Sequence, residues 1–404
     1  MAAAAAGGGG SSADRGSSGE EDAGGPAGES RYLAACRACG VTPASSLLRR
    51  TPGPALSLRH RGLGPRGAKA LALSLMVNTS ILTLDLSDNW LQGEGAAAIA
   101  EMLKENCYIS AVDLSDNKLG VEGAKAFSAM LLENTTIVFL QLSGNEFDDH
   151  AAKYLADAIT ANSKVEILDL SYNMFGDKAG EILGTAIAEN IGLKELKINW
   201  NHFHSQGAAA LAKGLAANIF LKVLDVSYNG FGNSGAAALG EALKANTVLE
   251  ELNVSSNRIL VEGALHIAAG LKENKTLKRL NMTRNPMQSE GCRGVLKALQ
   301  ANSGTGVEIL DLPDFCPISN EAKWHFYDTR ASTSTSSPFV NGARSEKAAL
   351  CHQDIPVNKE LAELCGAVKI LFPNLLLRYG GNVKLERKSQ LKAELLTQPK
   401  VLSF

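Results

Sequence analysis

Glycines at positions 62, 64 and 67 form a pattern that could cradle a phosphate. They match G-x-G-x-x-G between a predicted strand and a predicted helix, and Asp85 follows 18 residues after Gly67. In a dinucleotide site such glycines let the backbone approach the pyrophosphate. The same glycines recur in phase with a repeat, however, because Gly64 corresponds to Gly120, 56 residues later. We therefore interpret them as part of a repeated unit and expect no cofactor.

Two cysteines and two histidines have spacings that metal ligands could have. Cys36 and Cys39 form C-x-x-C, but zinc takes four ligands and no second pair follows at a suitable spacing. We interpret them as reduced cysteines in a capping helix over about 31–39. His202 and His204 share one loop without a third ligand in the adjacent units. No serine, cysteine or threonine is combined with a base in an arrangement that would make it a nucleophile, so we predict neither a metal site nor a catalytic residue.

Composition narrows the classes of function further. The chain has 404 residues, 45% hydrophobic and 20% charged, as in soluble globular proteins. A net charge of −2 creates no field that would draw it to nucleic acid or an anionic membrane. The N-terminal MAAAAAGGGG lacks the charged and apolar regions of a secretory signal, and seven scattered cysteines fit a reduced compartment. We expect a cytoplasmic monomer that binds a protein rather than nucleic acid or a membrane.

Two series of asparagines reveal the organisation of the chain. Within each series every member lies 28 residues from the next, and a period of this size predicts stacked repeats. The first asparagine ladder consists of Asn89, Asn117, Asn145, Asn173, Asn201, Asn229, Asn257 and Asn285. The second asparagine ladder consists of Asn78, Asn106, Asn134, Asn162, Asn190, Asn218, Asn246, Asn274 and Asn302.

Each repeat combines a short strand with an amphipathic helix. Before Asn89, Leu84 and Leu86 lie two residues apart and therefore point to one side of a strand. After Asn117, Ala124 and Phe127 begin a stripe with helical spacing. Alanine and glycine on this stripe should let the helix and strand layers approach closely. The pattern predicts an α/β solenoid in the form of a horseshoe, with a parallel concave sheet and convex α-helices.

The asparagines have predicted roles in satisfying the backbone. A turn between strand and helix leaves inward N–H and C=O groups without partners. An amide side chain both donates and accepts, so the first ladder should bridge neighbouring turns as a buried network. The second ladder follows the predicted helices. Because asparagine tolerates the left-handed conformation, we predict that it forms left-handed C-caps.

The repeated motif resembles that of the leucine-rich repeat proteins. LxxLxLxxN occurs in eight consecutive units over about 81–302, with the 28-residue period of the class that includes ribonuclease inhibitor and Ran GTPase-activating protein. The stretches LSLRHRGLGPRGAKAL, AANIFLKVLDVSYNGFG and NPMQSEGC are similar to segments of the leucine-rich repeat-containing protein 74 group. The resemblance implies a horseshoe-shaped solenoid and no defined activity.

The period also divides the chain into segments. The N-terminal segment holds too few large apolar side chains to fold, and a Ser/Thr-rich stretch interrupts the last repeat. We expect a disordered low-complexity tail over 1–30, an N-terminal capping segment over 31–55, leucine-rich repeats over 56–314, a disordered insertion over 315–354, the rest of the last repeat and a cap over 355–382, and a tail over 383–404.

Departures from the repeat consensus on the predicted concave face suggest a partner site. Tyr172, Trp200 and Tyr228 precede the ladder asparagine in three consecutive repeats, which should place them in a row about 10 Å long. Trp and Tyr are enriched in binding hot spots, although the rings could instead only pack on one another above the ladder. The candidate partner-binding residues are Phe139, Tyr172, Lys197, Asn199, Trp200 and Tyr228.

Charge differs between the two ends of the predicted arc. A partner with the opposite dipole would dock in one orientation. The charged residues are Asp85, Asp88, Asp113 and Asp116 near one end, and Arg279 and Arg284 near the other. We predict a non-enzymatic intracellular scaffold that binds a protein on its concave face. The alternative is a GTPase-activating or other regulatory protein resembling the Ran one, although that family carries an acidic tail and this chain ends in mildly basic residues.

Overall fold

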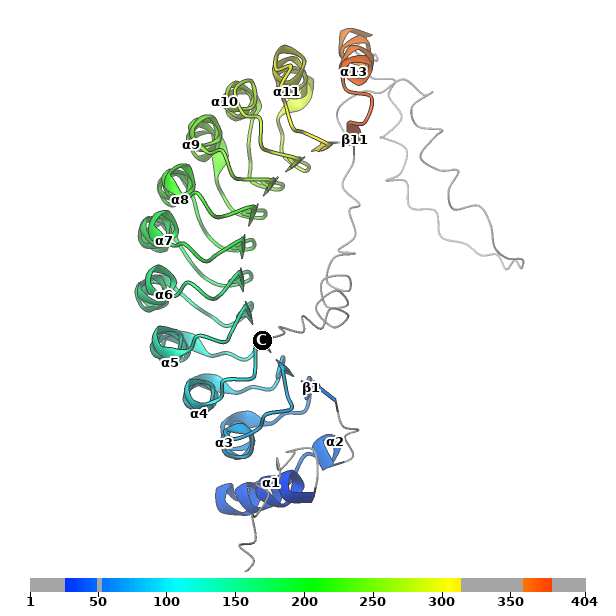
Figure 1. Cartoon of the computed structure of the whole chain (residues 1–404). Coiled ribbons are helices and arrows are strands. Elements are labelled where there is room, and N and C mark those ends of the chain that lie inside the picture. The colour runs from blue at the N-terminus through cyan, green and yellow to red at the C-terminus, as the bar shows by residue number, and fades with distance from the viewer. Residues whose placement is uncertain (1–25, 49–52, 314–358, 380–404) are drawn as a thin grey trace, which may run out of the picture.

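A computed structural model describes residues 26–48, 53–313 and 359–379 of the chain. In these ranges strands and helices alternate along one curved array, with the strands on the inner side and most helices on the outer side (Figure 1). The strands form an 11-stranded sheet whose spatial order is the sequence order from β1 to β11. All neighbouring strands pair in parallel, as in Leu56 with Leu84 and Leu84 with Val112. The predicted α/β leucine-rich repeat solenoid is confirmed.

The strands are short and the helices span three to four turns in most repeats. The strands are β1 (Ala55–Ser57), β2 (Thr83–Asp85), β3 (Ala111–Asp113), β4 (Phe139–Gln141), β5 (Ile167–Asp169), β6 (Glu195–Lys197), β7 (Val223–Asp225), β8 (Glu251–Asn253), β9 (Arg279–Asn281), β10 (Ile309–Leu312) and β11 (Leu376–Tyr379). The helices are α1 (Pro26–Cys39), α2 (Ser45–Leu48), α3 (Gly64–Leu75), α4 (Gln92–Glu105), α5 (Gly120–Glu133), α6 (Asp149–Ala161), α7 (Asp177–Glu189), α8 (Ser205–Ala217), α9 (Gly232–Ala245), α10 (Val261–Leu271), α11 (Gln288–Ala301) and α13 (Lys359–Leu371).

The core lies between the sheet and the helices and repeats with the chain. Leu84 and Leu86 are fully buried, as their spacing predicts. Four phenylalanines occupy equivalent positions two residues after a ladder asparagine, and the centroids of Phe175 and Phe203 lie 6.3 Å apart in a stacked arrangement. These fully buried rings are Phe147, Phe175, Phe203 and Phe231. A side chain buried in this way contributes about 1.5–3 kcal/mol to folding, so the core joins each repeat to the next.

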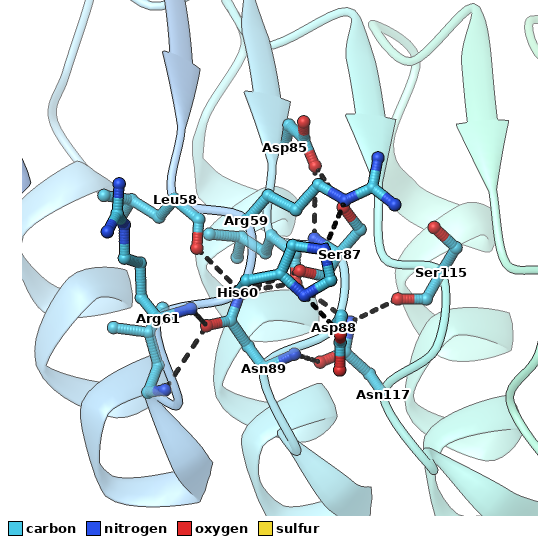
Figure 2. Close-up of polar contacts among 12 residues, drawn as sticks. Leu58, Arg59, His60, Arg61, Asp85, Ser87, Asp88, Asn89, Ser115 and Asn117 are labelled. Carbon is cyan, nitrogen blue, oxygen red and sulfur yellow. Dashed lines mark hydrogen bonds and ion pairs between the residues drawn. The ribbon is translucent and has the colours of Figure 1, made fainter. Parts of the chain in front are cut away.

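The first asparagine ladder joins neighbouring turns through buried amides. Figure 2 shows the pattern at Asn89, whose Oδ1 accepts from the N–H of Arg61 at 3.0 Å and whose Nδ2 donates to the carbonyl of Leu58 at 2.9 Å. The N–H of Asn89 then donates to Oδ1 of Asn117 at 2.9 Å. Both asparagines are fully buried, so their amides satisfy backbone groups that water cannot reach. The ladder therefore fixes each turn against the next.

The second asparagine ladder ends most helices, but the predicted left-handed conformation is wrong. Asn106 is the C-cap of α4 with φ −81° and ψ 117°, which is extended backbone. Its Oδ1 accepts from the N–H groups of Tyr108 and Ile109 at 2.9 and 3.0 Å, and its Nδ2 donates to the carbonyl of Leu75 at 2.9 Å. Because the side chain caps the helix ends, the backbone can run directly toward the next strand. The second ladder thus also bridges repeats.

Glycines allow neighbouring helices to approach, which differs from the predicted approach of helix to strand. A Cβ added to Gly180 of α7 would lie 2.5 Å from the Cα of Gly207 in α8. One added to Gly184 would lie 2.5 Å from the carbonyl oxygen of Ala210. A larger residue at either glycine would therefore push the two helix backbones apart, because interiors of this density leave no room for extra atoms. The close packing at these glycines is between helices of adjacent repeats.

The N-terminal helix begins earlier than predicted. α1 starts at Pro26, five residues before the expected capping segment over 31–55. Tyr32 and Cys36 are buried in it, and the hydroxyl of Tyr32 accepts from the N–H of Ala44 at 3.0 Å. Burial raises the pKa of Tyr32 to about 12. The aromatic side chain thus links α1 to the chain that leads toward the first strand.

The structure describes only some of the other predicted segments. The strand β11 pairs with β10 and extends the sheet, as expected for the C-terminal cap. The predicted disordered tail over 1–30 is wrong for residues 26–30, which lie in α1. Residues 1–25, the predicted insertion over 315–354 and the predicted tail over 383–404 lie outside the described residues. Within the described ranges, none of the helices is long and apolar enough to span a bilayer.

Replacing one ladder asparagine tests how far the fold depends on it. Asn117→Ala removes the Oδ1 that accepts from the N–H of Asn89 and the Nδ2 that donates to the carbonyls of Leu86 and Leu114. Because the backbone groups stay buried without partners, we expect a loss of about 3 kcal/mol in the free energy of unfolding, measured with urea. Lys125→Ala, an exposed change in the same repeat, is the control. Equal unfolding midpoints for the two variants would contradict the structural role of the ladder.

The packing of α7 against α8 gives a second prediction. In Gly184→Ala the new methyl group meets the backbone of α8, so we expect a loss of about 1–3 kcal/mol in urea unfolding. Gly366→Ala in α13 is the matched control, because nothing lies within 4 Å of its added Cβ. Alanine favours a helix over glycine, so the control should be neutral or stabilising. A stabilised Gly184→Ala variant would show that these helices pack more loosely.

Candidate functional site

The residue immediately before each first-ladder asparagine has a fixed and unusual backbone, and so does His60, which precedes Arg61 at the equivalent place in the first repeat. We call this place in the repeat the pre-ladder position. Its φ lies between 53° and 69° in every repeat from 60 to 284, which is the left-handed region. The backbone is held there by the next repeat, since the N–H of Trp200 donates to the carbonyl of Ser227 at 3.0 Å. The residues at this position are His60, Asp88, Asp116, Gly144, Tyr172, Trp200, Tyr228, Ser256 and Arg284.

Three bulky side chains at adjacent pre-ladder positions form a stack. The rings of Tyr172 and Trp200 are nearly parallel with centroids 5.3 Å apart, and those of Trp200 and Tyr228 lie 4.0 Å apart. Tyr172 is 49% exposed and Trp200 is 42% exposed. We call these residues the aromatic row. The rings therefore pack on one another and are also open to solvent, so the two alternatives left by the sequence do not exclude each other.

Charged residues lie at both ends of the aromatic row, each across a small residue. At one end Arg284 reaches over Ser256, contacts the hydroxyl of Tyr228 and places its guanidinium carbon 5.9 Å from the centre of that ring. At the other end Gly144 follows Asp116, and the carboxylate of Asp116 occupies the space where a Cβ of Gly144 would lie. The row is thus apolar in the middle, basic at one end and acidic at the other.

The remaining candidate residues lie on the same face but not in the aromatic row. Phe139 lies half-buried on β4 and pairs with Ile167 in the next strand. Lys197 lies on β6, where its Nζ is 2.8 Å from a carboxylate oxygen of Glu195. The carbonyl of Asn199 accepts from the N–H of Tyr172 at 3.0 Å, so its backbone helps to position the row. The structure brings Tyr172, Trp200 and Tyr228 together and leaves Phe139 and Lys197 in separate positions.

Most of the acidic residues predicted to mark one end of the arc have structural roles. Asp85 and Asp113 are buried, and Oδ1 of each accepts from the hydroxyl of the serine two residues later at 2.6 Å. The Asp-Leu-Ser pattern therefore closes a local turn. The carboxylate of Asp88 is paired with His60 (Figure 2). Asp116 is exposed, and no basic side chain among the described residues pairs with it.

Asp225 begins the equivalent Asp-Val-Ser segment at the end of β7 and lies in an environment that disfavours its charge. Its Oδ1 accepts from the hydroxyl and N–H of Ser227 at 2.6 and 2.9 Å, and its Oδ2 accepts from Nδ2 of Asn253 at 3.1 Å. Burial raises the pKa of this carboxyl, and the hydrogen bonds and the charge of Lys197 offset the rise only in part. The charged form of Asp225 is therefore disfavoured in the folded chain.

Other exposed features were not predicted from the sequence. Trp90 is 55% exposed, and the Nζ of Lys118 lies 4.2 Å from its ring centre and 4.0 Å from a carboxylate oxygen of Glu146. These three residues follow the ladder asparagine in consecutive repeats, so aligning the repeats position by position would have revealed them. Ile191 and Ile219 are also exposed, in equivalent loops between helix and strand.

The glycine and cysteine patterns take structural positions. The N–H of Gly64 donates to the carbonyl of Asn89 at 3.0 Å, and that of Gly120 donates to Asn145 at 3.0 Å. This equivalence supports reading the glycines as part of the repeat. Cys36 is buried and Cys39 partly buried, both as free thiols. Within the described ranges, no group of three or more His, Cys, Asp or Glu side chains is arranged to hold a metal ion.

Comparison with known families agrees with this architecture. A family model described as leucine-rich repeat matches residues 77–100, 105–128, 133–156, 161–183, 189–212, 217–240, 245–268 and 273–296. Each matched segment starts close to a second-ladder asparagine and runs through one strand and most of one helix. The chain belongs to the leucine-rich repeat family.

Within that family the chain is similar to leucine-rich repeat-containing protein 74B. It is 52% identical to the protein of Homo sapiens over 65 residues, which are 16% of this chain and 17% of the relative. It is 54% identical to the protein of Mus musculus over 50 residues, 12% of this chain and 13% of the relative. The matched stretches span less than a fifth of either relative's length.

Two solved structures are similar to part of the chain. Leiomodin-1 Actin-Binding Site 2 is 22% identical, with a TM-score of 0.33 over 36% of this chain and 86% of that chain. TLR13 in its complex with ssRNA13 is 19% identical, with a TM-score of 0.37 over 59% of this chain and 30% of that chain.

The environment of Asp225 gives a prediction about stability and pH. Its pKa is higher in the folded than in the unfolded chain, so the folded state loses stability as the pH rises and the carboxyl ionises. Asp225→Asn carries no charge and keeps the Oδ1 acceptor for Ser227, as Asn253 does for the N–H of Ser255 at 3.1 Å, while the Oδ2 that accepts from Asn253 is replaced by an amide nitrogen. This last change does not depend on pH, so the change of the stability difference with pH reports the charge. We therefore expect the variant to unfold at a higher urea concentration than the wild type at pH 7, with a smaller difference at pH 4. A difference that does not change with pH would contradict this reasoning.

Proposed function

We propose that the chain is a non-enzymatic intracellular scaffold that binds a protein partner on its concave face through the aromatic row. The observation that carries this proposal is the presence of Tyr172, Trp200 and Tyr228 in left-handed backbone. Bulky residues are uncommon in that region, where glycine or asparagine fits at lower energy. Gly144 occupies the same position one repeat earlier, so the fold itself does not require an aromatic side chain there.

Several properties of the row are those of a binding hot spot. Its rings are large, and each can bury about 150–250 Å² when it is covered. The backbone of each ring is hydrogen-bonded to the next repeat, and the rings stack on one another. Little conformational freedom would therefore be lost when a partner binds, which favours affinity. Asn199 directly precedes Trp200 in the chain and could supply a polar contact at the rim of the row, whereas Lys197 lies apart from the rings on β6.

A non-enzymatic role agrees with the chemistry of the described residues. The buried polar side chains are mainly ladder asparagines and the Asp and Ser residues of the local turns, and they hydrogen-bond within the repeats. A group that satisfies backbone atoms in this way is not available to a substrate. The exposed side chains of the row offer stacking area and hydrogen bonds, which suit recognition rather than bond making.

Removing the central ring tests the proposal. In Trp200→Ala the row loses its middle member, so we expect the affinity for the partner to fall by at least about thirtyfold, which corresponds to about 2 kcal/mol. The partner is identified by proximity labelling in cells, and its affinity for each purified variant is then measured by calorimetry. The unfolding temperature should stay close to that of the wild type, because the rings lie outside the buried core.

Trp90→Ala is the matched control, since Trp90 is also exposed, is also in left-handed backbone and lies outside the row. We expect it to keep the full set of labelled proteins. If both variants label the same proteins in cells and bind the purified partner with the same affinity, the row is not the binding site. If Trp200→Ala unfolds, the row is part of the folding core and the proposal fails.

A further inference from the structure

We propose that the acidic end of the aromatic row binds the guanidinium group of an arginine in the partner, between the carboxylate of Asp116 and the ring of Tyr172. This inference rests on the proposed function and adds the chemistry of the group that is recognised. It follows from what the structure places at that end of the row and from how the chain fills comparable positions elsewhere.

The ring of Tyr172 has one stacked face and one open face. Trp200 covers the face toward the C-terminal repeats. The repeat on the other side carries Gly144 at the pre-ladder position, so it offers no side chain to cover the second face. Tyr172 remains half exposed although Trp200 is stacked on one of its faces. An aromatic face is electron-rich and attracts cations.

Asp116 places a negative charge beside that open face. Its carboxylate lies over Gly144, in the space that a larger residue would fill, and therefore next in line to Tyr172. Burial and the nearby Tyr228 hydroxyl are the largest of the effects that raise the pKa of Tyr172, and the charge of Asp116 contributes to the same rise. The carboxylate and the ring face both favour a positive charge, and in the described residues neither has a cation.

On this surface the chain itself twice places a cationic side chain against an aromatic ring. At the basic end of the row Arg284 crosses the small Ser256 to reach the ring and hydroxyl of Tyr228. At the position directly after the ladder asparagine, the ammonium of Lys118 lies near both the ring of Trp90 in the repeat before and a carboxylate oxygen of Glu146 in the repeat after. Ring, cation and carboxylate thus occur in line across consecutive repeats. At Tyr172 and Asp116 the ring and the carboxylate are present and the cation is missing.

The nearby basic side chains are already paired with other carboxylates, so a cation at this position would come from a partner. His60 is paired with Asp88, and Lys118 is within 4.0 Å of Glu146. An arginine fits better than a lysine, because a planar guanidinium can lie flat on a ring while its N–H groups donate to a carboxylate. Asp116 is exposed, so a side chain can reach it without rearrangement of the repeats.

A titration with a small arginine derivative tests the inference without the partner. The full chain carries three tryptophans and is labelled with fluorotryptophan, and N-acetyl-arginine amide is added at millimolar concentrations. We expect a saturable change in the fluorine signal of Trp200, which stacks on Tyr172. N-acetyl-citrulline amide, which has the same shape without the charge, should cause no such change.

Two variants assign the effect to the proposed site. Asp116→Asn should weaken the binding of the arginine derivative by about tenfold. Gly144→Asn keeps the charge of Asp116, and asparagine tolerates left-handed backbone. Its side chain should displace the carboxylate of Asp116 from the space over residue 144, so we expect it to weaken the binding of the arginine derivative to a similar extent. Asp88→Asn is the matched control, because it removes the same charge from the same position one repeat earlier and should bind as the wild type does.

The outcomes separate this inference from the proposed function. If the arginine and citrulline derivatives behave alike, or if Asp116→Asn binds as tightly as the wild type, the arginine site is wrong. A labelled partner that is lost in Trp200→Ala and bound normally by Asp116→Asn would keep the proposed function and overturn the arginine site. Binding of the arginine derivative without any partner lost in Trp200→Ala would keep the site and overturn the proposed function.

Discussion

The side-chain amide of the first-ladder asparagine is the interaction on which the rest of the structure depends. Each amide accepts from N–H groups of the preceding repeat and donates to its carbonyl, while its own backbone N–H often binds the next amide, as in Asn89 and Asn117. The turn must therefore have the same shape in every repeat. One consequence is the left-handed backbone of the residue before each asparagine, whatever its type. The fold thus sets the direction of a row of side chains and leaves their chemistry open.

This separation between fold and chemistry explains where the chain can vary. Leucines on the strands, phenylalanines behind the ladder and glycines between helices are each confined by close neighbours, as at Leu84, Phe175 and Gly184. A change at such a position creates a cavity or a collision. The pre-ladder position has no such neighbour on its solvent side, and it accepts a histidine, two acids, a glycine, three aromatics, a serine and an arginine in turn. Variation in repeat proteins is therefore informative at positions of this kind.

The sequence was sufficient to predict the architecture but not all of the local geometry. Period, strand and helix follow from spacing alone, so the ladders at Asn89 and Asn78 could be assigned in advance. The left-handed backbone at Trp200 and the extended backbone at Asn106 could not, because each depends on hydrogen bonds to a neighbouring repeat. The burial of Asp85 was missed for the same reason, since an Asp-Leu-Ser pattern does not reveal which oxygen is already bonded.

The order of side chains along the row gives the surface a direction. An exposed acid at Asp116, a gap at Gly144, three rings, a small residue at Ser256 and a base at Arg284 follow one another along consecutive repeats. Stacking on the rings is tolerant of sequence and supplies contact area, whereas the charge at either end favours the opposite charge and repels the same one. A partner segment that lies along the rings with its chain reversed would bring its arginine to Arg284 and lose the contact with Asp116. The small residues Gly144 and Ser256 therefore matter as much as the rings, because each opens the space through which a charge reaches the stack.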